Sequence, residues 1–109
     1  MTKRTQFTVE LAGLLQYMAN EGDLPILDFV KRSTEEQQRL FAAKLSKCDG
    51  VTKISKHQIG LAADIYLLDE QGKLLDWNKV IDKAVKYHTY WDNVGGKMQI
   101  EWDRGHFEF

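Results

Sequence analysis

Residues 55–68 read SKHQIGLAADIYLL, a strand-like apolar run that contains one charged residue, Asp64, and follows a histidine, His57. A buried carboxylate needs a cation, a metal or several hydrogen-bond donors, although Asp64 could instead cap a nearby loop. Residues seven positions apart on an unbroken strand point to opposite faces, so His57 and Asp64 would be separated. Gly60 lies between them and can adopt backbone conformations closed to other residues. We therefore expect a turn at Gly60 that brings His57 round to Asp64.

A second polar segment near the C-terminus, Asp103-Arg104-Gly105-His106, offers another histidine and another carboxylate. Gly105 favours a tight turn, in which Asp103 and His106 would address the same metal-bound water. Two histidines and one carboxylate leave a fourth position open for water, as in catalytic zinc sites, whereas a structural zinc site is closed. Because such spacings also occur by chance, the residues alone leave open whether the site is catalytic.

The third histidine, His88, falls on the apolar face of a predicted helix. A histidine in that position is more often a packed, hydrogen-bonded core residue than a metal ligand, so we expect a structural role. A three-histidine site that includes His88 is the alternative. Cys48 is the only cysteine, which excludes an internal disulfide framework and a multi-cysteine zinc site. Any metal site must therefore use histidine and carboxylate ligands, and Cys48 is assigned no role.

Periodicity and turn signals along the rest of the chain predict helices mixed with an antiparallel hairpin. The predicted elements are a helix over 5–20, a strand over 26–30, a helix over 33–48, a strand over 59–68, a turn over 69–72 with a second hairpin arm over 73–77, a helix over 78–91, and strand and loop over 98–109. The apolar face of the helix over 78–91 comprises Val80, Ile81, Ala84, Val85 and His88. This mixture indicates a small α+β domain.

Length and composition limit the classes of protein that fit. The 109 residues suit one domain over 1–109. A net charge of -1 gives no excess of positive charge with which to bind nucleic acid. There is no apolar window long enough to span a bilayer. The N-terminus lacks the unbroken apolar core of a signal peptide, so we expect cytoplasmic synthesis. We also expect a monomer.

Read as a string, residues 55–64 resemble the S-x-H-x-x-G-x-A-x-D signature of the zinc D-alanyl-D-alanine carboxypeptidases and the related phage L-alanyl-D-glutamate endolysins, the VanY-like peptidases. The C-terminal segment, in which Gly95-Gly96 precedes Asp103-x-x-His106-Phe107-Glu108, resembles the end of the endolysin-type members. Residues 32–37 resemble the arginine-to-glutamine segment that opens a helix in this family. The resemblance thus covers three ordered blocks between residues 32 and 109.

The resemblance implies the hedgehog/DD-peptidase fold, a compact α+β arrangement of an antiparallel sheet with flanking helices. It implies one zinc ion held by His57, Asp64 and His106. It also implies that Asp103 is the general base. These four residues are the predicted centre of the site.

Three further residues are assigned roles by the same resemblance. Arg32 would bind the substrate or stabilise the negative charge that develops on the attacked carbonyl oxygen. The alternative for Arg32 is a solvated charge ahead of a helix. Gln37 and Ser55 would be supporting polar residues, in contact with the substrate or next to the ligands.

The function implied by the resemblance is zinc-dependent hydrolysis of a peptide bond in peptidoglycan, with the stem peptide as partner. The His-Phe-Glu ending favours an L-alanyl-D-glutamate endopeptidase over a D-alanyl-D-alanine carboxypeptidase. It also favours a phage or prophage lysis enzyme that reaches the wall after release. The chain departs from the family at two places: it has Gly105 where proline is frequent and Lys97-Met98 where tryptophan is common. These departures affect the shape of the substrate subsites and therefore which peptide bond is cut. The alternative is a non-catalytic zinc-containing binding module of the same fold.

Overall fold

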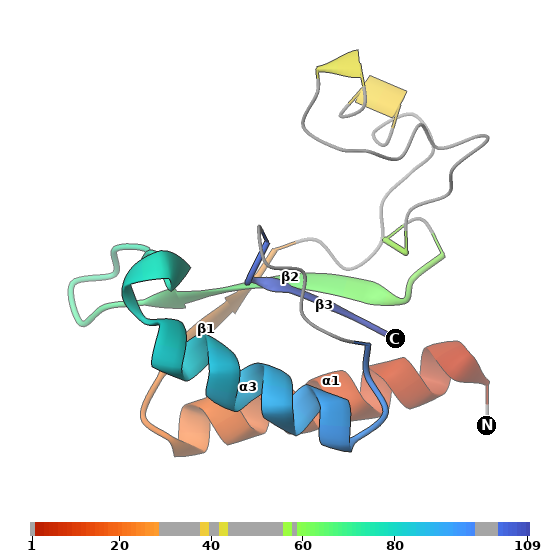
Figure 1. Cartoon of the computed structure of the whole chain (residues 1–109), viewed down its shortest axis with the longest axis horizontal. Coiled ribbons are helices and arrows are strands. Elements are labelled where there is room, and N and C mark those ends of the chain that lie inside the picture. The colour runs from red at the N-terminus through yellow and green to blue at the C-terminus, as the bar shows by residue number, and fades with distance from the viewer. Residues whose placement is uncertain (1, 29–37, 40–41, 44–55, 58, 98–102) are drawn as a thin grey trace.

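Two helices and a three-stranded sheet make up most of the part of the chain that the computed structural model describes, residues 2–28, 38–39, 42–43, 56–57, 59–97 and 103–109. The elements are α1 (Lys3–Asn20), β1 (Leu24–Leu27), β2 (Ala62–Leu68), the short 3-10 helix η1 (Trp77–Lys79), α3 (Ile81–Asn93) and β3 (His106–Glu108). Figure 1 shows the two helices running beneath the strands. The predicted α+β class, an antiparallel sheet with flanking helices, is confirmed.

Helix α1 begins two residues before the predicted start because Thr2 caps it. The Thr2 backbone is extended, and its hydroxyl accepts a hydrogen bond from the Thr5 N–H (3.2 Å). One face of α1 lies against the core, where its four buried residues are Phe7, Leu11, Leu14 and Met18. Their helical spacing places them on one face, so burial of this face fixes α1 against the sheet.

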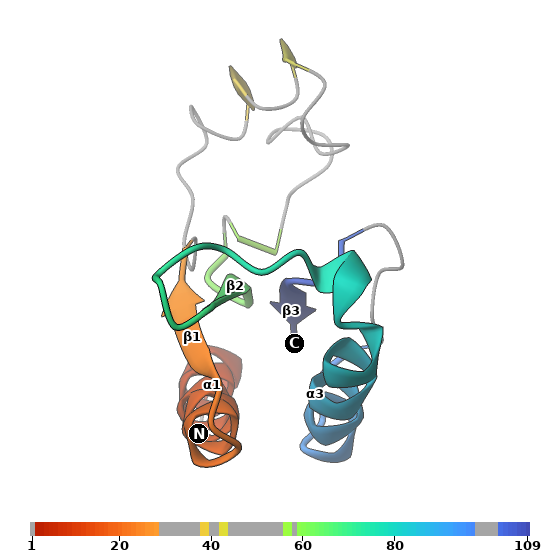
Figure 2. The ribbon, with the colours of Figure 1, turned by 90° about the vertical axis from the view of Figure 1, so that its left-hand side faces the viewer.

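Strand β2 is the centre of the sheet and pairs antiparallel with both neighbours. Leu27 of β1 lies opposite Ile65, and His106 of β3 lies opposite Asp64. Because side chains alternate along a strand, the sheet has two unlike faces. We call the face toward the helices the inner face and the opposite one the outer face (Figure 2). The outer face carries Asp64, Tyr66, His106 and Glu108.

The core lies between the inner face and the two helices. Trp91 of α3 is fully buried, and its ring packs edge-on against Phe7 and Phe107 at 6.0 Å between centroids in each case. Its indole N–H donates to the Glu108 carbonyl oxygen (2.7 Å), which ties α3 to β3. The buried apolar residues that β2, β3 and the positions next to them contribute to this core are Leu61, Ala63, Ile65, Leu67, Phe107 and Phe109. No helix in the described residues is long and apolar enough to cross a membrane.

The predicted hairpin forms, but its second arm is much shorter than predicted. The turn after β2 forms, with the Asp69 carboxylate accepting hydrogen bonds from the Gln71 and Lys73 N–H groups (2.9 Å each). Beyond it, however, residues 73–77 contribute only an isolated bridge at Leu74, which is 63% exposed. Asp76 then caps η1 by accepting from the Asn78 N–H (2.9 Å), so the chain leaves the sheet.

The boundaries of three other predicted elements also change. Strand β1 covers 24–27 instead of 26–30, and β2 begins at Ala62 because residues 59–60 form a turn. Helix α3 begins at Ile81, after η1, and its buried face is Ala84, Tyr87, His88 and Trp91. Ile81 and Val85, predicted for that face, are 47% and 56% exposed.

The predicted helix over 33–48 lies mostly outside the described residues, and so does Cys48. Within it, Gln38, Arg39 and Ala42 are helical. The Ala43 N–H donates to the Arg39 carbonyl oxygen (3.0 Å), which is the spacing of an α-helical hydrogen bond.

A buried polar cluster joins the turn after α1 to α3. Asp23 is 8% exposed and accepts hydrogen bonds from the Tyr87 hydroxyl and from Lys83 Nζ (2.5 Å). Burial alone would raise the pKa of Asp23, but the hydrogen bonds from Lys83 and Tyr87 outweigh burial and lower it. The ionised carboxylate therefore stabilises the packing of α1 against α3.

We predict that Asp23→Ala lowers the free energy of unfolding by about 2 kcal/mol near neutral pH, because the buried Tyr87 hydroxyl loses its acceptor. Since the pKa of Asp23 is lower in the folded chain, its contribution is present above the unfolded pKa of about 3.9 and is lost as pH falls through the folded pKa. Urea unfolding of wild type and Asp23→Ala, from neutral to acidic pH, measures this gap. Glu70→Ala, at an exposed turn position, is the control; a gap that stays constant with pH would contradict the assignment.

Candidate metal centre

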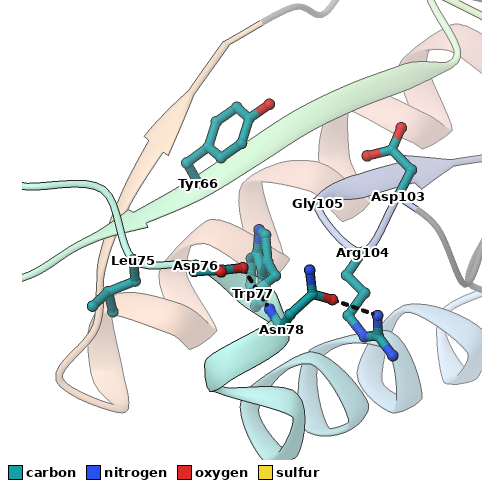
Figure 3. A pocket seen from close by; sticks show the side chains of 8 residues that line it. All are labelled: Tyr66, Leu75, Asp76, Trp77, Asn78, Asp103, Arg104 and Gly105. Atoms are coloured by element: carbon teal, nitrogen blue, oxygen red, sulfur yellow. Dashed lines mark hydrogen bonds between the residues drawn. The ribbon is translucent and has the colours of Figure 1, made fainter.

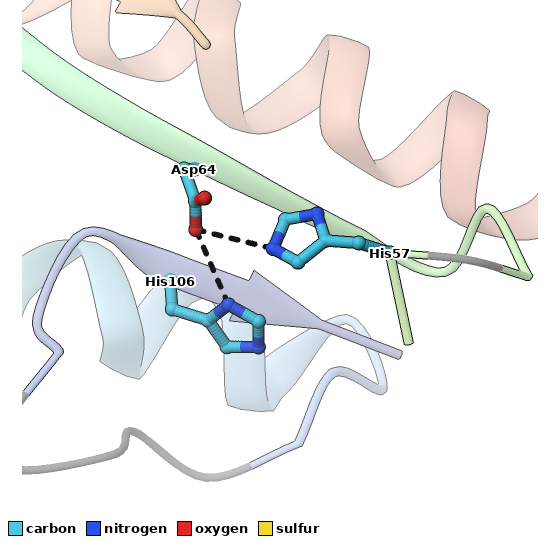
Figure 4. A group of neighbouring side chains, drawn as sticks. All are labelled: His57, Asp64 and His106. Carbon is cyan, nitrogen blue, oxygen red and sulfur yellow. Dashed lines mark hydrogen bonds and ion pairs between the residues drawn. The ribbon is translucent and has the colours of Figure 1, made fainter. Parts of the chain in front are cut away.

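Three side chains that are distant in sequence converge at the outer face of the sheet. His57 precedes β2, Asp64 lies within β2, and His106 begins β3 (Figure 4). His57 Nε2 and His106 Nδ1 are each 3.3 Å from Asp64 Oδ1. One ligand atom from each of the three residues lies within 4.8 Å of the other two. The structure thus brings together the three residues predicted to hold the metal.

The turn predicted at Gly60 is present and accounts for the position of His57. Gly60 has φ +72°, and its N–H donates to the His57 carbonyl oxygen (3.3 Å). Other L-residues rarely adopt this left-handed conformation. A Cβ atom at Gly60 would also lie 2.7 Å from Nε of Arg4 on α1. Glycine at this position therefore permits both the reversal of the chain and the close contact with α1.

The loop before β3 is held against β2 by backbone contacts. The Gly105 carbonyl oxygen accepts from the Ile65 N–H (2.8 Å), and the His106 N–H donates to the Asp103 carbonyl oxygen (3.1 Å). A Cβ atom at Gly105 would lie 2.7 Å from the Ile65 carbonyl oxygen and 2.9 Å from Trp77 Nε1. Trp77 Nε1 itself donates to that oxygen (3.0 Å). The absence of a side chain at Gly105 thus allows the approach that sets His106 opposite Asp64.

The three side chains fit a zinc ion in chemistry, and both histidines fit it in their distance from Asp64. Zinc bonds of about 2.0–2.1 Å in a tetrahedral arrangement separate ligand atoms by about 3.3 Å. Both histidine-to-Asp64 distances match this value. The side chains of His57, Asp64 and His106 are 3%, 16% and 11% exposed, so the site is shielded without being closed. Two imidazoles and one carboxylate are the donors of many catalytic zinc sites.

Electrostatics keep Asp64 charged. Burial would raise the pKa of Asp64, but hydrogen bonds from His106 and His57, and then their charges, hold it well below its ordinary value. Burial would lower the pKa of His106, but the hydrogen bond and charge of Asp64, followed by the charges of Asp103 and Glu108, raise it. A metal ion at this site would therefore compete with a proton on His106.

Asp103 lines an open pocket of about 200 Å³, whose lining also includes Gly105, the residue before His106, and Tyr66, two positions after Asp64. The pocket is lined by Tyr66, Leu75, Asp76, Trp77, Asn78, Asp103, Arg104 and Gly105 (Figure 3). Burial, and then the charges of Asp64, Asp103 and Asp28, raise the pKa of the Tyr66 hydroxyl. The Tyr66 phenol is therefore neutral near pH 7 and available as a hydrogen-bond donor to a molecule in the pocket.

His88 lies on the other side of the sheet from the cluster. Its ring is 4% exposed and stacks on Phe107, an inner-face residue, at 4.0 Å between centroids. Its Nε2–H donates to the Arg104 carbonyl oxygen (2.8 Å), and burial lowers its pKa. His88 therefore supports the loop that leads to His106, and the structure does not bring it to the other two histidines as a three-histidine site would require.

Several predicted site residues lie outside the described part of the chain: Arg32, Gln37 and Ser55. Conversely, sequence reasoning assigned no role to Tyr66, Trp77 or Glu108. For two of these a signal existed, because Tyr66 and Glu108 stand two positions after Asp64 and His106. In a strand that spacing places each on the same face as the preceding ligand candidate.

Comparison with known proteins adds a fold likeness to this geometry. No protein-family model matches the chain, and no curated protein matches it by sequence. The solved structure of the L,D-carboxypeptidase DacB from Streptococcus pneumoniae is similar, with a TM-score of 0.62, 19% identity and 96% of this chain covered. VanYB in complex with D-alanine-D-alanine is similar with a TM-score of 0.65, 20% identity and 94% covered. The chain spans 65% of the DacB chain and 68% of the VanYB chain.

We predict that Gly60→Ala weakens zinc binding, because strain at φ +72° displaces the turn that carries His57. Gly72→Ala is a matched control, since Gly72 has φ +80° in the turn after β2, which carries none of the three ligand candidates. Each variant should lose about 1 kcal/mol of unfolding free energy from the left-handed conformation. Titration with a competing chelator should show weaker zinc binding only in Gly60→Ala. Equal zinc affinity in both variants would contradict this account of the turn.

Proposed function

We propose that the chain is a zinc-dependent peptidase that hydrolyses a peptide bond in the stem peptide of peptidoglycan. The observation that carries the proposal is the cluster of His57, Asp64 and His106 on the outer face of the sheet. Two proteins with the same fold support it, because DacB is an L,D-carboxypeptidase and VanYB is known in complex with D-alanine-D-alanine. In this proposal, residues 1–109 form a single peptidase domain.

His57, Asp64 and His106 are the residues that would hold the zinc ion. When bound, zinc supplies a Lewis acid that polarises a carbonyl group and lowers the pKa of water to about 7. Asp64 brings one negative charge to the site, and its low pKa keeps that charge over the whole range of neutral pH. The imidazoles of His57 and His106 are largely buried, so they shield the centre from bulk water where they line it.

Asp103 is the residue to which we assign the proton transfer. Hydrolysis adds water across the peptide bond: the carbonyl carbon gains the water oxygen, the C–N bond breaks, and the leaving amine gains a proton. Asp103 precedes His106 by one tight turn and lines the open pocket of about 200 Å³. A carboxylate there would accept the proton of the attacking water and pass it to the leaving amine.

The pocket beside Asp103 is where we place the substrate next to the reacting bond. Its polar groups include the neutral Tyr66 phenol, Asn78 and Arg104, whose guanidinium donates to the Asn78 side-chain oxygen (2.8 Å). We propose that Arg32 stabilises the developing negative charge on the carbonyl oxygen. Gln37 and Ser55 would support the substrate or the metal ligands. These three roles rest on the sequence resemblance.

Within this class, we favour an L-alanyl-D-glutamate endopeptidase, because the segment Asp103-x-x-His106-Phe107-Glu108 resembles the corresponding segment of the endolysin-type members. A D-alanyl-D-alanine carboxypeptidase is the alternative, and the fold likeness to VanYB is the observation in its favour. We further propose that the protein is a phage or prophage lysis enzyme, made in the cytoplasm and acting on the wall as a monomer after release.

Incubation of the pure protein with peptidoglycan, followed by mass spectrometry, tests the proposed function. We expect new chain ends that depend on zinc and disappear when a chelator removes it. New termini between L-alanine and D-glutamate would identify the endopeptidase, whereas released D-alanine would identify the carboxypeptidase. If no zinc-dependent cleavage occurs at any enzyme concentration, the peptidase proposal is wrong.

Asp103→Asn separates the enzyme from a zinc-containing binding module of the same fold. We predict that this variant binds zinc as well as the wild type but cleaves peptidoglycan at least about 100-fold more slowly, because the proton acceptor is gone. Chelator titration and the mass-spectrometric assay measure the two properties on the same preparation. Unchanged cleavage would show that Asp103 is not the base. A wild type that binds wall peptide without cleaving it would favour the binding module.

A further inference from the structure

The imidazole of His106 lies between two carboxylates on the outer face of the sheet. Its Nδ1 atom is 3.3 Å from Asp64 Oδ1, and its Nε2 atom is 3.3 Å from Glu108 Oε1. The side chains of His106 and Glu108 are 11% and 17% exposed, so water competes weakly for this contact. One ring nitrogen thus faces the candidate metal centre, and the other faces Glu108.

The position of Glu108 follows from strand β3. His106 and Glu108 are two residues apart, so both side chains project to the outer face while Phe107 between them is buried in the core. In the register with β2, Glu108 lies opposite Ala62, whose small side chain leaves room beside His106. The carboxylate therefore approaches the ring along the same strand.

The backbone around Glu108 is held on both sides. Its carbonyl oxygen accepts hydrogen bonds from Trp91 Nε1 (2.7 Å) and from the Lys97 N–H (2.9 Å). The next residue, Phe109, donates its N–H to the Leu61 carbonyl oxygen (2.8 Å). These three bonds join β3 to α3, to the segment that follows α3, and to the start of β2. The carboxylate of Glu108 is thus attached to a fixed point of the fold.

We infer that Glu108 is a positioning residue that fixes the tautomer and orientation of His106 for metal binding. A neutral imidazole carries one N–H, and a carboxylate can only accept. When Nε2–H donates to Glu108, Nδ1 is left with its lone pair directed toward Asp64 and His57. Histidine ligands of metals commonly donate their second N–H to a carboxylate in this way, which orients the ring and strengthens the ligand.

This inference rests on the proposed function only in requiring that the cluster bind a metal, and its readouts do not depend on cleavage. Removal of such a partner typically weakens metal binding by roughly 10- to 100-fold. We therefore expect Glu108→Ala to lower zinc affinity by that factor. Glu108→Gln retains a side-chain oxygen that can accept from Nε2–H, so most of the affinity should remain. Glu70→Ala controls for the loss of one exposed carboxylate.

The experiment is a zinc titration of the full chain against a competing chelator, together with NMR of the histidine ring nitrogens in the zinc-bound protein. We expect a proton on Nε2 of His106 in the wild type and in Glu108→Gln, with a mixed or changed signal in Glu108→Ala.

If the zinc affinity of Glu108→Ala is within about threefold of the wild-type value, the loss is smaller than the usual loss of roughly 10- to 100-fold, and the inference is wrong. A proton on Nδ1 in the wild type would also overturn the inference. Equal losses in both variants would show instead that Glu108 is itself a ligand. A protein that binds zinc but cleaves nothing would refute the peptidase and leave this role intact.

Discussion

The antiparallel pairing of β2 with β3 sets Asp64 opposite His106 and fixes the positions of the residues around both. It places a carboxylate within a strand whose neighbours are buried, where an unpartnered charge would be costly. The two histidines provide the partners, and their contacts hold the pKa of Asp64 low. The same pairing sends Phe107 to the inner face, where it packs against Trp91. The register of β3 against β2 therefore determines both the packing of Phe107 in the core and the contact between Asp64 and His106.

The elements around this pairing restrict its movement. Gly60 reverses the chain beside α1, which brings His57 to the cluster. Gly105 lies against Ile65 and Trp77 without room for a side chain, and His88 holds the same loop from the inner side. The metal-binding candidates thus belong to short segments whose backbones are fixed by the core. Such support is what a metal centre needs, because small shifts of its ligands weaken binding.

Local chemistry made part of the site predictable from sequence. Asp64 is a charged residue inside an apolar strand, which indicated that it needs a partner. Gly60 lies between Asp64 and His57, which indicated a turn that makes His57 that partner. The second hairpin arm was predicted to be too long because Asp69–Gly72 signals a turn without specifying which strands pair with β2. The strands that do pair with β2 along its length, β1 and β3, are some forty residues away, and local sequence carries little information on such pairing. Residues such as Arg32 were reached by resemblance alone, and their roles remain proposals.

We propose that His57, Asp64 and His106 bind one zinc ion together. Measurement of zinc content in purified wild type, Asp64→Ala and His88→Ala tests it most directly, with folding of each checked by circular dichroism. We expect about one zinc ion per chain in the wild type and in His88→Ala, and loss of zinc in Asp64→Ala. Loss of zinc in His88→Ala with retention in Asp64→Ala would contradict it.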